Sequence, residues 1–381
     1  MPRNLVVCCD GTNNQFGPEN TNVVRLVQVI QHSPQTQLVY YDPGVGTFPE
    51  PGAWTRIGKR LSEWIDLAFA TDLSRRVQQA YVYLMNYWQP GDQTYLVGFS
   101  RGAYTVRVLA ALLYHLGLLP RGSENMVPYA MRLFSGTRTD TDDDSRTGNY
   151  WQLCNEFRRT FARPIHGNDQ RHFPTHFLGA WDTVSSVGWV WNPKSYPYTR
   201  FNPGIAHARH AMALDERRCF FRQNHLTKKD GATQDLMQGY FPGVHSDVGG
   251  GYNNSRLWQC PFDWLLDEAR NLGLDIDTTR RNALQQHASA QSWTEKQHES
   301  LTLRWWIAEF IPKKVYNDKT EKRTWRLGLG RHRTINDGEL LHESVLRRIT
   351  DTAYAPTNLS ARFIANVRAL AATPPWLPYE Q

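Results

Sequence analysis

The chain has 381 residues, of which 40% are hydrophobic and 21% are charged. This composition excludes global disorder and leaves room for one large α/β domain with insertions. The net charge of +7 is a moderate excess, and no dense Lys/Arg run or binding motif predicts a nucleic-acid partner. The five cysteines are scattered and lack the spacing of a zinc site or a disulfide framework, so we expect no metal and no cofactor.

The first residues run into an apolar stretch at 5–9, which leaves no room for a signal peptide. The longest apolar stretch, around residues 106–119, is interrupted and too short to span a bilayer. The sequence therefore predicts a soluble, cytoplasmic protein, with export by a route that needs no cleaved signal left open.

In chain order, the first predicted strand covers residues 5–9 and is followed by Asp10, Gly11 and Thr12. Loops at the carboxyl ends of parallel strands are where open α/β sheets bind ligands. One interpretation is an oxyanion loop, in which a main-chain N–H of Gly11 or Thr12 points at the reacting group. The other is a plain Asp-Gly turn. The local sequence leaves both open.

Helical and extended patterns then alternate along the chain. The spacing of apolar residues predicts a helix over 22–30, a strand over 37–41, helices over 61–70 and 73–88, and a strand from residue 94. Because such alternation is typical of βαβ units, we predict a mostly parallel sheet flanked by helices.

The strand from residue 94 runs into Gly-Phe-Ser-Arg-Gly at 98–102, and a helical pattern follows at once. This is the sequence form of a nucleophile elbow, in which a serine occupies a sharp turn between a strand and a helix. Gly98 and Gly102 give room where a Cβ would clash. We therefore predict Ser100 as the nucleophile of an α/β-hydrolase-like fold, with the main-chain N–H of Arg101 as an oxyanion donor.

Beyond the elbow helix, the chain is polar over residues 120–149. This insertion is interpreted either as a lid over the active site or as a solvated loop, and the loop is favoured. Further along, the pattern predicts helices over 150–161, 205–221, 261–272 and 340–349, and a strand over 175–180.

A serine nucleophile needs a base and an acid that orients the base. In α/β-hydrolases the chain order is Ser, Asp, His. Asp182 follows the strand predicted at 175–180, and His245 lies in a glycine-rich loop, so we predict these two residues as acid and base. Histidines at 207, 210 and 225 are assigned to helical surroundings, and the histidine at 342 is a weaker candidate.

Two other aspartates are predicted to support the site. Asp10 precedes the serine, which is the wrong chain order for the acid. Asp247 is too close in sequence to His245 to orient it, but its side chain suits local hydrogen bonds that hold the loop. Either carboxylate is a candidate partner for the Arg101 side chain.

Residues 303–333 place aromatic side chains beside many Lys and Arg residues. Helices that lie in a membrane interface have this composition, so contact with a membrane surface is one interpretation. A packed aromatic element beside a solvated basic loop is the other, and it is favoured because large aromatic side chains usually belong to a core.

Together these motifs resemble the catalytic domain of the type VI secretion lipase effectors with phospholipase A activity. The resemblance rests on CDGTNN at 9–14, YDPGVGT at 41–47, GFSRGA at 98–103, FLGAWDTV at 177–184 and FPGVHSDVGGGY at 241–252, with further matches at 211–218 and 342–345. It implies an α/β-hydrolase fold with its triad at Ser100, Asp182 and His245. We expect residues 1–350 to form this catalytic domain and 351–381 to form a C-terminal extension.

The predicted function is a serine hydrolase that cleaves carboxylic esters, with an ester or a lipid such as a phospholipid as substrate. Two alternatives stay open. One is a non-enzymatic hydrolase-like scaffold that binds a partner. The other is a phosphatase with Asp10 as nucleophile, although the paired acid usual two residues further on in such phosphatases is absent.

Overall fold

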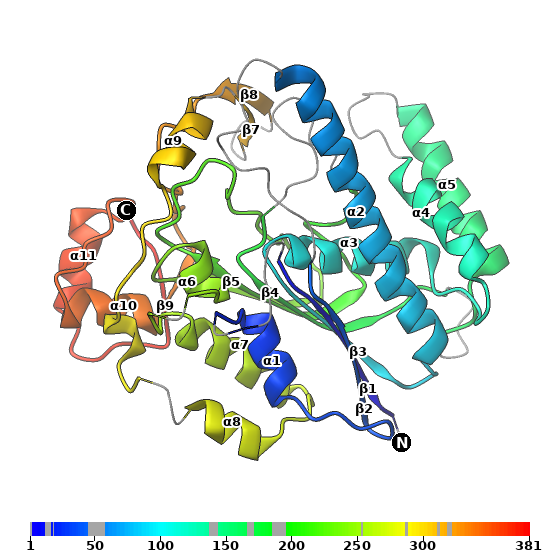
Figure 1. The fold of residues 1–381 in the computed structure, drawn as a ribbon, viewed down its shortest axis with the longest axis horizontal. Helices are drawn as coiled ribbons and strands as arrows, with labels where there is room; N and C mark the ends of the chain where they lie inside the picture. Colours follow the sequence, from blue (N-terminus) through cyan, green and yellow to red (C-terminus); the bar gives the residue numbers. More distant parts are fainter. Residues whose placement is uncertain are drawn as a thin grey trace.

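The structure is a computed structural model. It describes residues 2–11, 17, 19–44, 58–136, 144–165, 171–184, 196–252, 254–285, 289–310, 313–317 and 322–381. An eight-stranded sheet runs through the molecule between two layers of helices (Figure 1). The strand order is β10-β9-β6-β5-β4-β3-β1-β2, and every neighbouring pair is parallel except β10 with β9. The strands are β1 (Asn4–Cys9), β2 (Gln37–Asp42), β3 (Gln93–Phe99), β4 (Thr175–Trp181), β5 (Ile205–Ala213), β6 (Asp235–Phe241), β9 (Leu340–His342) and β10 (Trp376–Pro378).

Helices cover both faces of the sheet (Figure 1). One layer contains α2 (Gly58–Tyr87), α3 (Arg101–Leu116), α4 (Val127–Ser135) and α5 (Asp144–Phe161), and the other contains α1 (Asn22–Val29), α7 (Gln259–Asn271) and α8 (Thr278–Gln285). Strand β1 serves both layers, since side chains alternate across a strand. Leu5 and Val7 pack into the core on the α2–α3 side, and Val6 and Cys8 pack into the core on the α1–α7 side.

The remaining elements are shorter helices and a two-stranded hairpin. They are η2 (Glu124–Met126), α6 (His245–Gly249), η3 (Ser292–Thr294), α9 (Leu303–Glu309), the hairpin of β7 (Lys313–Asn317) and β8 (Lys322–Arg326), α10 (Glu343–Asp351) and α11 (Ala361–Arg368). In Figure 1, α9 and the hairpin lie together at the top of the view. Among the described residues, no helix has both the length and the apolar character needed to cross a membrane.

The strand order places a switch point between β1 and β3. After β1 the chain forms β2 on one side of it, and β3 then pairs on its other side. In open α/β sheets, ligands bind outside the carboxyl ends of the strands at such a point. Asp10 follows β1 and Ser100 follows β3, so two of the predicted loops meet at the switch point.

The helix predicted over 205–221 is wrong, because residues 205–213 form strand β5 in the middle of the sheet. This strand is buried on both faces over its last six residues. A strand of that kind shows no alternation of polar and apolar residues, so its periodicity does not distinguish it from a buried helix. The helix predicted over 340–349 begins only at Glu343, since β9 occupies the first three positions.

The insertion at 120–149 is not simply a solvated loop. Helix α4 occupies 127–135 and buries Val127, Ala130, Met131 and Phe134 against the core. These positions follow the i, i+3, i+4, i+7 spacing of a helix with one apolar face. Residues 137–143 lie outside the described part of the chain.

The segment after residue 350 belongs to the sheet. Strand β10 pairs antiparallel with β9, and Phe363 and Val367 of α11 pack with Leu341 and Val345 in a third apolar cluster. The expected C-terminal extension therefore supplies the last strand of the sheet and the helix that covers it.

Candidate active site

Ser100 occupies a sharp turn between β3 and α3. Its backbone has φ 59° and ψ −121°, a conformation that L-residues adopt at a cost. Its N–H donates to the carbonyl of Trp181 at 3.0 Å, which ties the turn to β4. The flanking glycines are required by space, since a Cβ on Gly98 would lie 2.6 Å from the Ala103 nitrogen and one on Gly102 would overlap the Cys9 carbonyl oxygen.

The structure brings Ser100, His245 and Asp182 into one hydrogen-bonded chain. His245 Nε2 lies 2.9 Å from Ser100 Oγ, and His245 Nδ1 lies 2.6 Å from Asp182 Oδ2. All three residues are buried. Because the carboxylate accepts a hydrogen bond from Nδ1–H, the neutral imidazole presents an unprotonated Nε2 to the serine hydroxyl.

The sheet positions Asp182 and His245, the predicted acid and base. Asp182 follows β4 directly, and its N–H donates to the Ala211 carbonyl of β5 at 2.7 Å. His245 is the first residue of α6, which begins shortly after β6. The N–H of His245 donates to the buried carboxylate of Glu216 at 3.2 Å. The carboxyl ends of β3, β4 and β6 thus carry the three side chains to the same edge of the sheet.

Arg333 is a site residue that sequence reasoning missed, since it was grouped with the basic residues of a solvated loop. Its terminal nitrogens Nη1 and Nη2 donate to Asp182 Oδ1 at 2.5 Å and to Oδ2 at 2.9 Å. Burial by itself would raise the pKa of Asp182, but the Arg333 guanidinium, together with His245, outweighs burial and holds that pKa well below its usual value. The carboxylate therefore stays ionised.

Aromatic rings enclose the His245 imidazole. The ring centroid of Phe99 lies 4.6 Å from that of the imidazole. The ring centroid of Phe221 lies 4.8 Å from it, in an edge-on arrangement. Burial lowers the pKa of His245, and the hydrogen bond and charge of Asp182 offset only part of that effect. The imidazole is consequently neutral near pH 7, which is the form that accepts a proton.

Glu216 is a second residue that the sequence did not reveal. Besides the His245 N–H, it accepts hydrogen bonds from Ser300 Oγ at 2.9 Å and from Arg218 at 2.9 Å. Burial raises the pKa of Glu216, but the neighbouring Arg218 outweighs it and lowers the pKa to about 2. This ionised carboxylate anchors the start of α6 through the backbone of His245.

The predicted oxyanion donors have different surroundings. The N–H of Arg101 is at the first position of α3, at the positive end of the helix dipole. The N–H of Gly11 donates to Asp10 Oδ1 at 2.7 Å, so in this arrangement it is engaged by its neighbour. Thr12 lies outside the described residues.

Asp10 and Asp247 do not accept hydrogen bonds from Arg101, contrary to the pairing considered for that side chain. Asp10 Oδ2 accepts from Thr21 at 2.6 Å and from Tyr41 at 3.1 Å. Asp247 accepts from the Val244 N–H at 3.0 Å and lies 2.6 Å from His298 Nδ1. Asp10 thus holds the loop after β1, and Asp247 holds the turn before His245. Burial lowers the pKa of Arg101 to about 9.

The rival histidines are occupied elsewhere. His207 and His210 lie on β5, not on a helix. His207 pairs with Asp235, and buried His210 accepts the Thr183 N–H at 3.2 Å. His225 lies 3.3 Å from Glu339, and His342 stacks on Phe241. Across the described residues, no group of three or more His, Cys, Asp or Glu side chains is arranged to hold a metal ion.

A family model described as the catalytic domain of the Tle1-like phospholipase effectors of the type VI secretion system matches residues 3–268. The chain belongs to this family. The family is one of lipid-hydrolysing enzymes, in agreement with the resemblance drawn from the motifs. Ser100, Asp182 and His245 all lie within the matched residues, whereas Arg333 lies beyond them.

Known relatives cover this chain only in part. The uncharacterized protein YEL023C of Saccharomyces cerevisiae is 34% identical over 229 residues, which are 58% of this chain and 32% of that protein. An uncharacterized protein from Pseudomonas aeruginosa gives a TM-score of 0.37 at 18% identity, over 76% of this chain and 51% of that one. The Tle1 effector bound to the VgrG spike gives a TM-score of 0.34 at 20% identity, over 67% of this chain and 53% of that one. The match thus spans about a third of the curated relative's length.

Proposed function

We propose that this protein is a serine hydrolase that cleaves carboxylic esters of lipids, with Ser100 as nucleophile, His245 as general base and Asp182 as the acid that orients the base. The observation that carries the proposal is the continuous contact from Ser100 Oγ through His245 to Asp182, at 2.9 and 2.6 Å. A phospholipid is the proposed substrate, since the family is one of phospholipase effectors.

The chemistry proceeds through an acyl-enzyme. His245 Nε2 takes the proton of Ser100 while Oγ attacks the ester carbonyl. The N–H of Arg101 stabilises the oxyanion. The intermediate collapses as His245 returns the proton to the leaving alcohol. Water then repeats the sequence on the acyl-enzyme and releases the fatty acid.

The experiment compares wild type with Ser100→Ala. Wild type should be labelled by a fluorophosphonate probe and should release fatty acid from mixed phosphatidylglycerol and phosphatidylethanolamine vesicles. Ser100→Ala should lose both the labelling and the release of fatty acid, with an unchanged Tm. Vesicle hydrolysis that persists in the folded variant would overturn the proposal. Comparing substrates labelled at the sn-1 or the sn-2 acyl chain identifies the ester that is cleaved.

We further propose that α9 contacts the lipid surface. Leu303 is 86% exposed and Phe310, next to the end of this helix, is 62% exposed, the two highest values among the large apolar side chains of the described residues. Trp305 packs edge-on against Phe221 at 5.6 Å, and Phe221 lies against His245. Lys and Arg outnumber Asp and Glu across 303–333, as suits an anionic surface. The exposed end of α9 is thus connected through two rings to the reacting imidazole.

The phosphatase alternative receives no support from the surroundings of Asp10. Both oxygens of its carboxylate accept hydrogen bonds, from the Gly11 N–H and from the hydroxyls of Thr21 and Tyr41. Such contacts hold a carboxylate in place and lower its nucleophilicity. Asp10 fits the role of a residue that fixes the loop after β1.

A further inference from the structure

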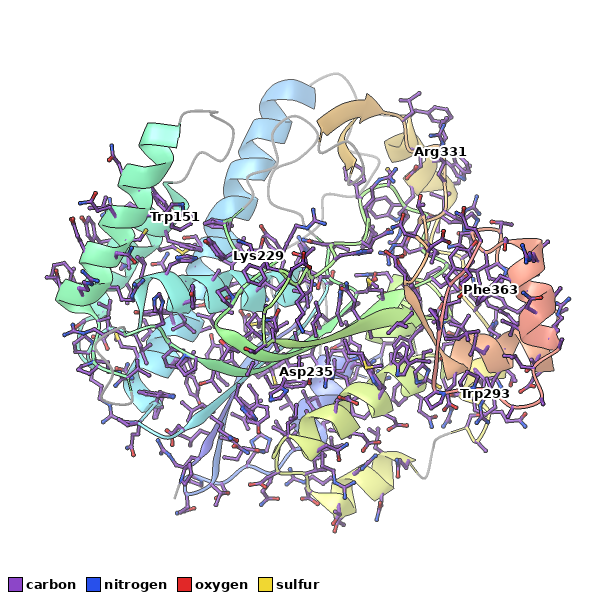
Figure 2. All side chains as sticks on the ribbon, turned by 180° about the vertical axis from the view of Figure 1, so that it is seen from behind. Trp151, Lys229, Asp235, Trp293, Arg331 and Phe363 are labelled. Carbon is purple, nitrogen blue, oxygen red and sulfur yellow. The ribbon has the colours of Figure 1, made fainter. Side chains whose placement is uncertain are left out.

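Arg333 differs in burial from its neighbour Arg331. Arg331, two positions earlier, is exposed and lies at the periphery of the molecule beside α9 (Figure 2). Arg333 is only 4% exposed, and its partner Asp182 is 151 residues away in the chain. A buried guanidinium is costly unless it is paired and hydrogen-bonded. Its burial therefore points to a specific task at the acid of the site.

The guanidinium of Arg333 is fixed on two sides. On the Asp182 side, each terminal nitrogen donates to a different carboxylate oxygen, the bidentate geometry that only arginine supplies. On the other side, Nη1 donates to the Ala213 carbonyl at 2.8 Å and Nη2 donates to the Phe221 carbonyl. These carbonyls belong to β5 and to the segment that follows it, so the cation is held by the frame of the site.

The Asp182 carboxylate consequently has no rotational freedom. Oδ1 accepts from Arg333 and from the Ala213 N–H at 2.9 Å. Oδ2 accepts from Arg333 and lies 2.6 Å from His245 Nδ1. We propose that Arg333 is a positioning residue of the active site, which locks the plane of the Asp182 carboxylate, aims His245 at Ser100, and neutralises part of the charge that Asp182 presents to the imidazole. This inference rests on the proposed function of the triad.

The charges around His245 decide the expected pH dependence. Asp182 and Glu216 face it with negative charge, Arg218 faces it with positive charge, and burial opposes its protonation. Behind Asp182 lie Arg333, the ring of His210 and the hydroxyl of Tyr240. Loss of the Arg333 cation leaves Asp182 with its full charge toward the imidazole, which favours the protonated form of His245.

The first test measures the pH profile of kcat with a soluble nitrophenyl ester for wild type, Arg333→Gln and Arg333→Lys. We expect Arg333→Gln to lower kcat at least about 10-fold and to move the acidic limb upward by about one pH unit. Arg333→Lys should keep the limb in place, because the charge remains. It should still lose kcat, because one ammonium does not fix both oxygens.

Arg209→Gln is the matched control. Arg209 is buried at 7% exposure and pairs with Asp235 and Glu268, well along β5 from Ala213, which contacts Asp182. Arg209→Gln should lower Tm without moving the acidic limb of the kcat pH profile. An Arg333→Gln variant that loses activity equally at all pH values, as a merely destabilised protein does, would overturn the proposal. If Arg333→Gln fails to fold, wild-type kcat in Arg333→Lys would overturn it.

The second test does not depend on turnover. NMR titration of histidine-labelled protein reports the pKa of His245 directly, assigned by comparison with His245→Gln. An upward shift in Arg333→Gln and none in Arg209→Gln supports the positioning role, and an unchanged pKa contradicts it. If Ser100→Ala retained esterase activity, the proposed function would fail while this titration would still report whether Arg333 acts on the Asp182–His245 pair.

Discussion

The ring of Phe99 packs on the imidazole of His245, with centroids 4.6 Å apart and an angle of 31° between the planes. The residue before Ser100 thus supports the imidazole of His245. The same ring lies against Gly249, at the end of α6, where a Cβ would overlap the ring atoms of Phe99. The absence of a side chain at Gly249 is therefore a condition for the position of His245.

We expect Gly249→Ala to displace the Phe99 ring and, with it, the imidazole. The predicted result is a loss of kcat of about 10-fold or more, since small misplacements of a catalytic group are costly. Steady-state kinetics with a soluble ester measure it. Gly136→Ala is the control, because Gly136 has a helical φ of −73° and its nearest neighbouring atom would be 3.3 Å from a Cβ. Wild-type kcat in Gly249→Ala would contradict the prediction.

The proposed contact of α9 with the lipid surface predicts different effects on two substrates. The double variant Leu303→Ser, Phe310→Ser should hydrolyse anionic vesicles several-fold more slowly, because it loses apolar area for insertion. It should keep its rate on a soluble ester. Leu370→Ser removes another exposed leucine, 39% exposed after α11, and should leave both rates unchanged. Equal rates of vesicle hydrolysis for wild type, the double variant and Leu370→Ser would count against membrane contact by α9.

Glu309 is predicted to fasten the end of α9 to the site. Its side chain is fully buried and accepts the N–H groups of Cys219 at 2.8 Å and Gly330 at 3.0 Å. Glu309→Ala would leave both donors unsatisfied, so we expect a loss of about 2–4 kcal/mol in the free energy of unfolding. Glu309→Gln keeps one acceptor oxygen, so its free energy of unfolding should fall less than that of Glu309→Ala.

Urea denaturation measures these losses. Glu299→Ala serves as the control, because the Glu299 side chain is 60% exposed and lies 3.4 Å from Arg217 in a surface pair. Such pairs contribute little to stability. If Glu309→Ala were no less stable than Glu299→Ala, the anchoring role of Glu309 would be excluded.

His342 gives a prediction for stability against pH. Burial, with a smaller contribution from Arg347, lowers its pKa to about 3, whereas the unfolded chain has a histidine pKa of about 6.5. The unfolded state thus binds more protons between these values. Stability from this group is fully present above pH 6.5 and is lost as the pH falls toward 3, by about 2 kcal/mol at pH 5.

The variant His342→Asn separates this effect from the capping role of the residue. His342 Nδ1 accepts the Ser344 N–H at 3.1 Å at the start of α10, and asparagine also caps helices well. Thermal unfolding from pH 7 to pH 4 should therefore show a flatter pH dependence in His342→Asn. His32→Asn, at an exposed histidine, should follow wild type. If the stability of His342→Asn depended on pH as steeply as that of the wild type, the assignment to His342 would be refuted.

The sequence predicts the local features of the site well. The strand, the turn glycines and the helix around Ser100 are neighbours in the chain, so one short window carries the whole requirement for the turn. Asp182 and His245 each follow a strand that ends in a recognisable loop. Local patterns of this kind need no knowledge of distant contacts.

Arg333 and β5 depend on distant contacts and were therefore missed or misassigned. Arg333 follows a run of Lys and Arg residues, and only the fold brings it to Asp182, 151 residues away. Strand β5 is central and buried on both faces, so its apolar run carries no period that excludes a helix. Helix α4 was predictable, because its four buried positions keep helical spacing inside a polar stretch.

The backbone contacts of the site have a consequence for hydrogen exchange. The Ser100 N–H donates to Trp181 and the Asp182 N–H donates to Ala211, so both amides continue the ladders of the central strands. Amides of such strands exchange only when the whole domain opens, whereas surface elements exchange through local fluctuations. We therefore expect Ser100 and Asp182 to belong to the part of the molecule that opens last. Partial opening of the surface would leave these two residues in place.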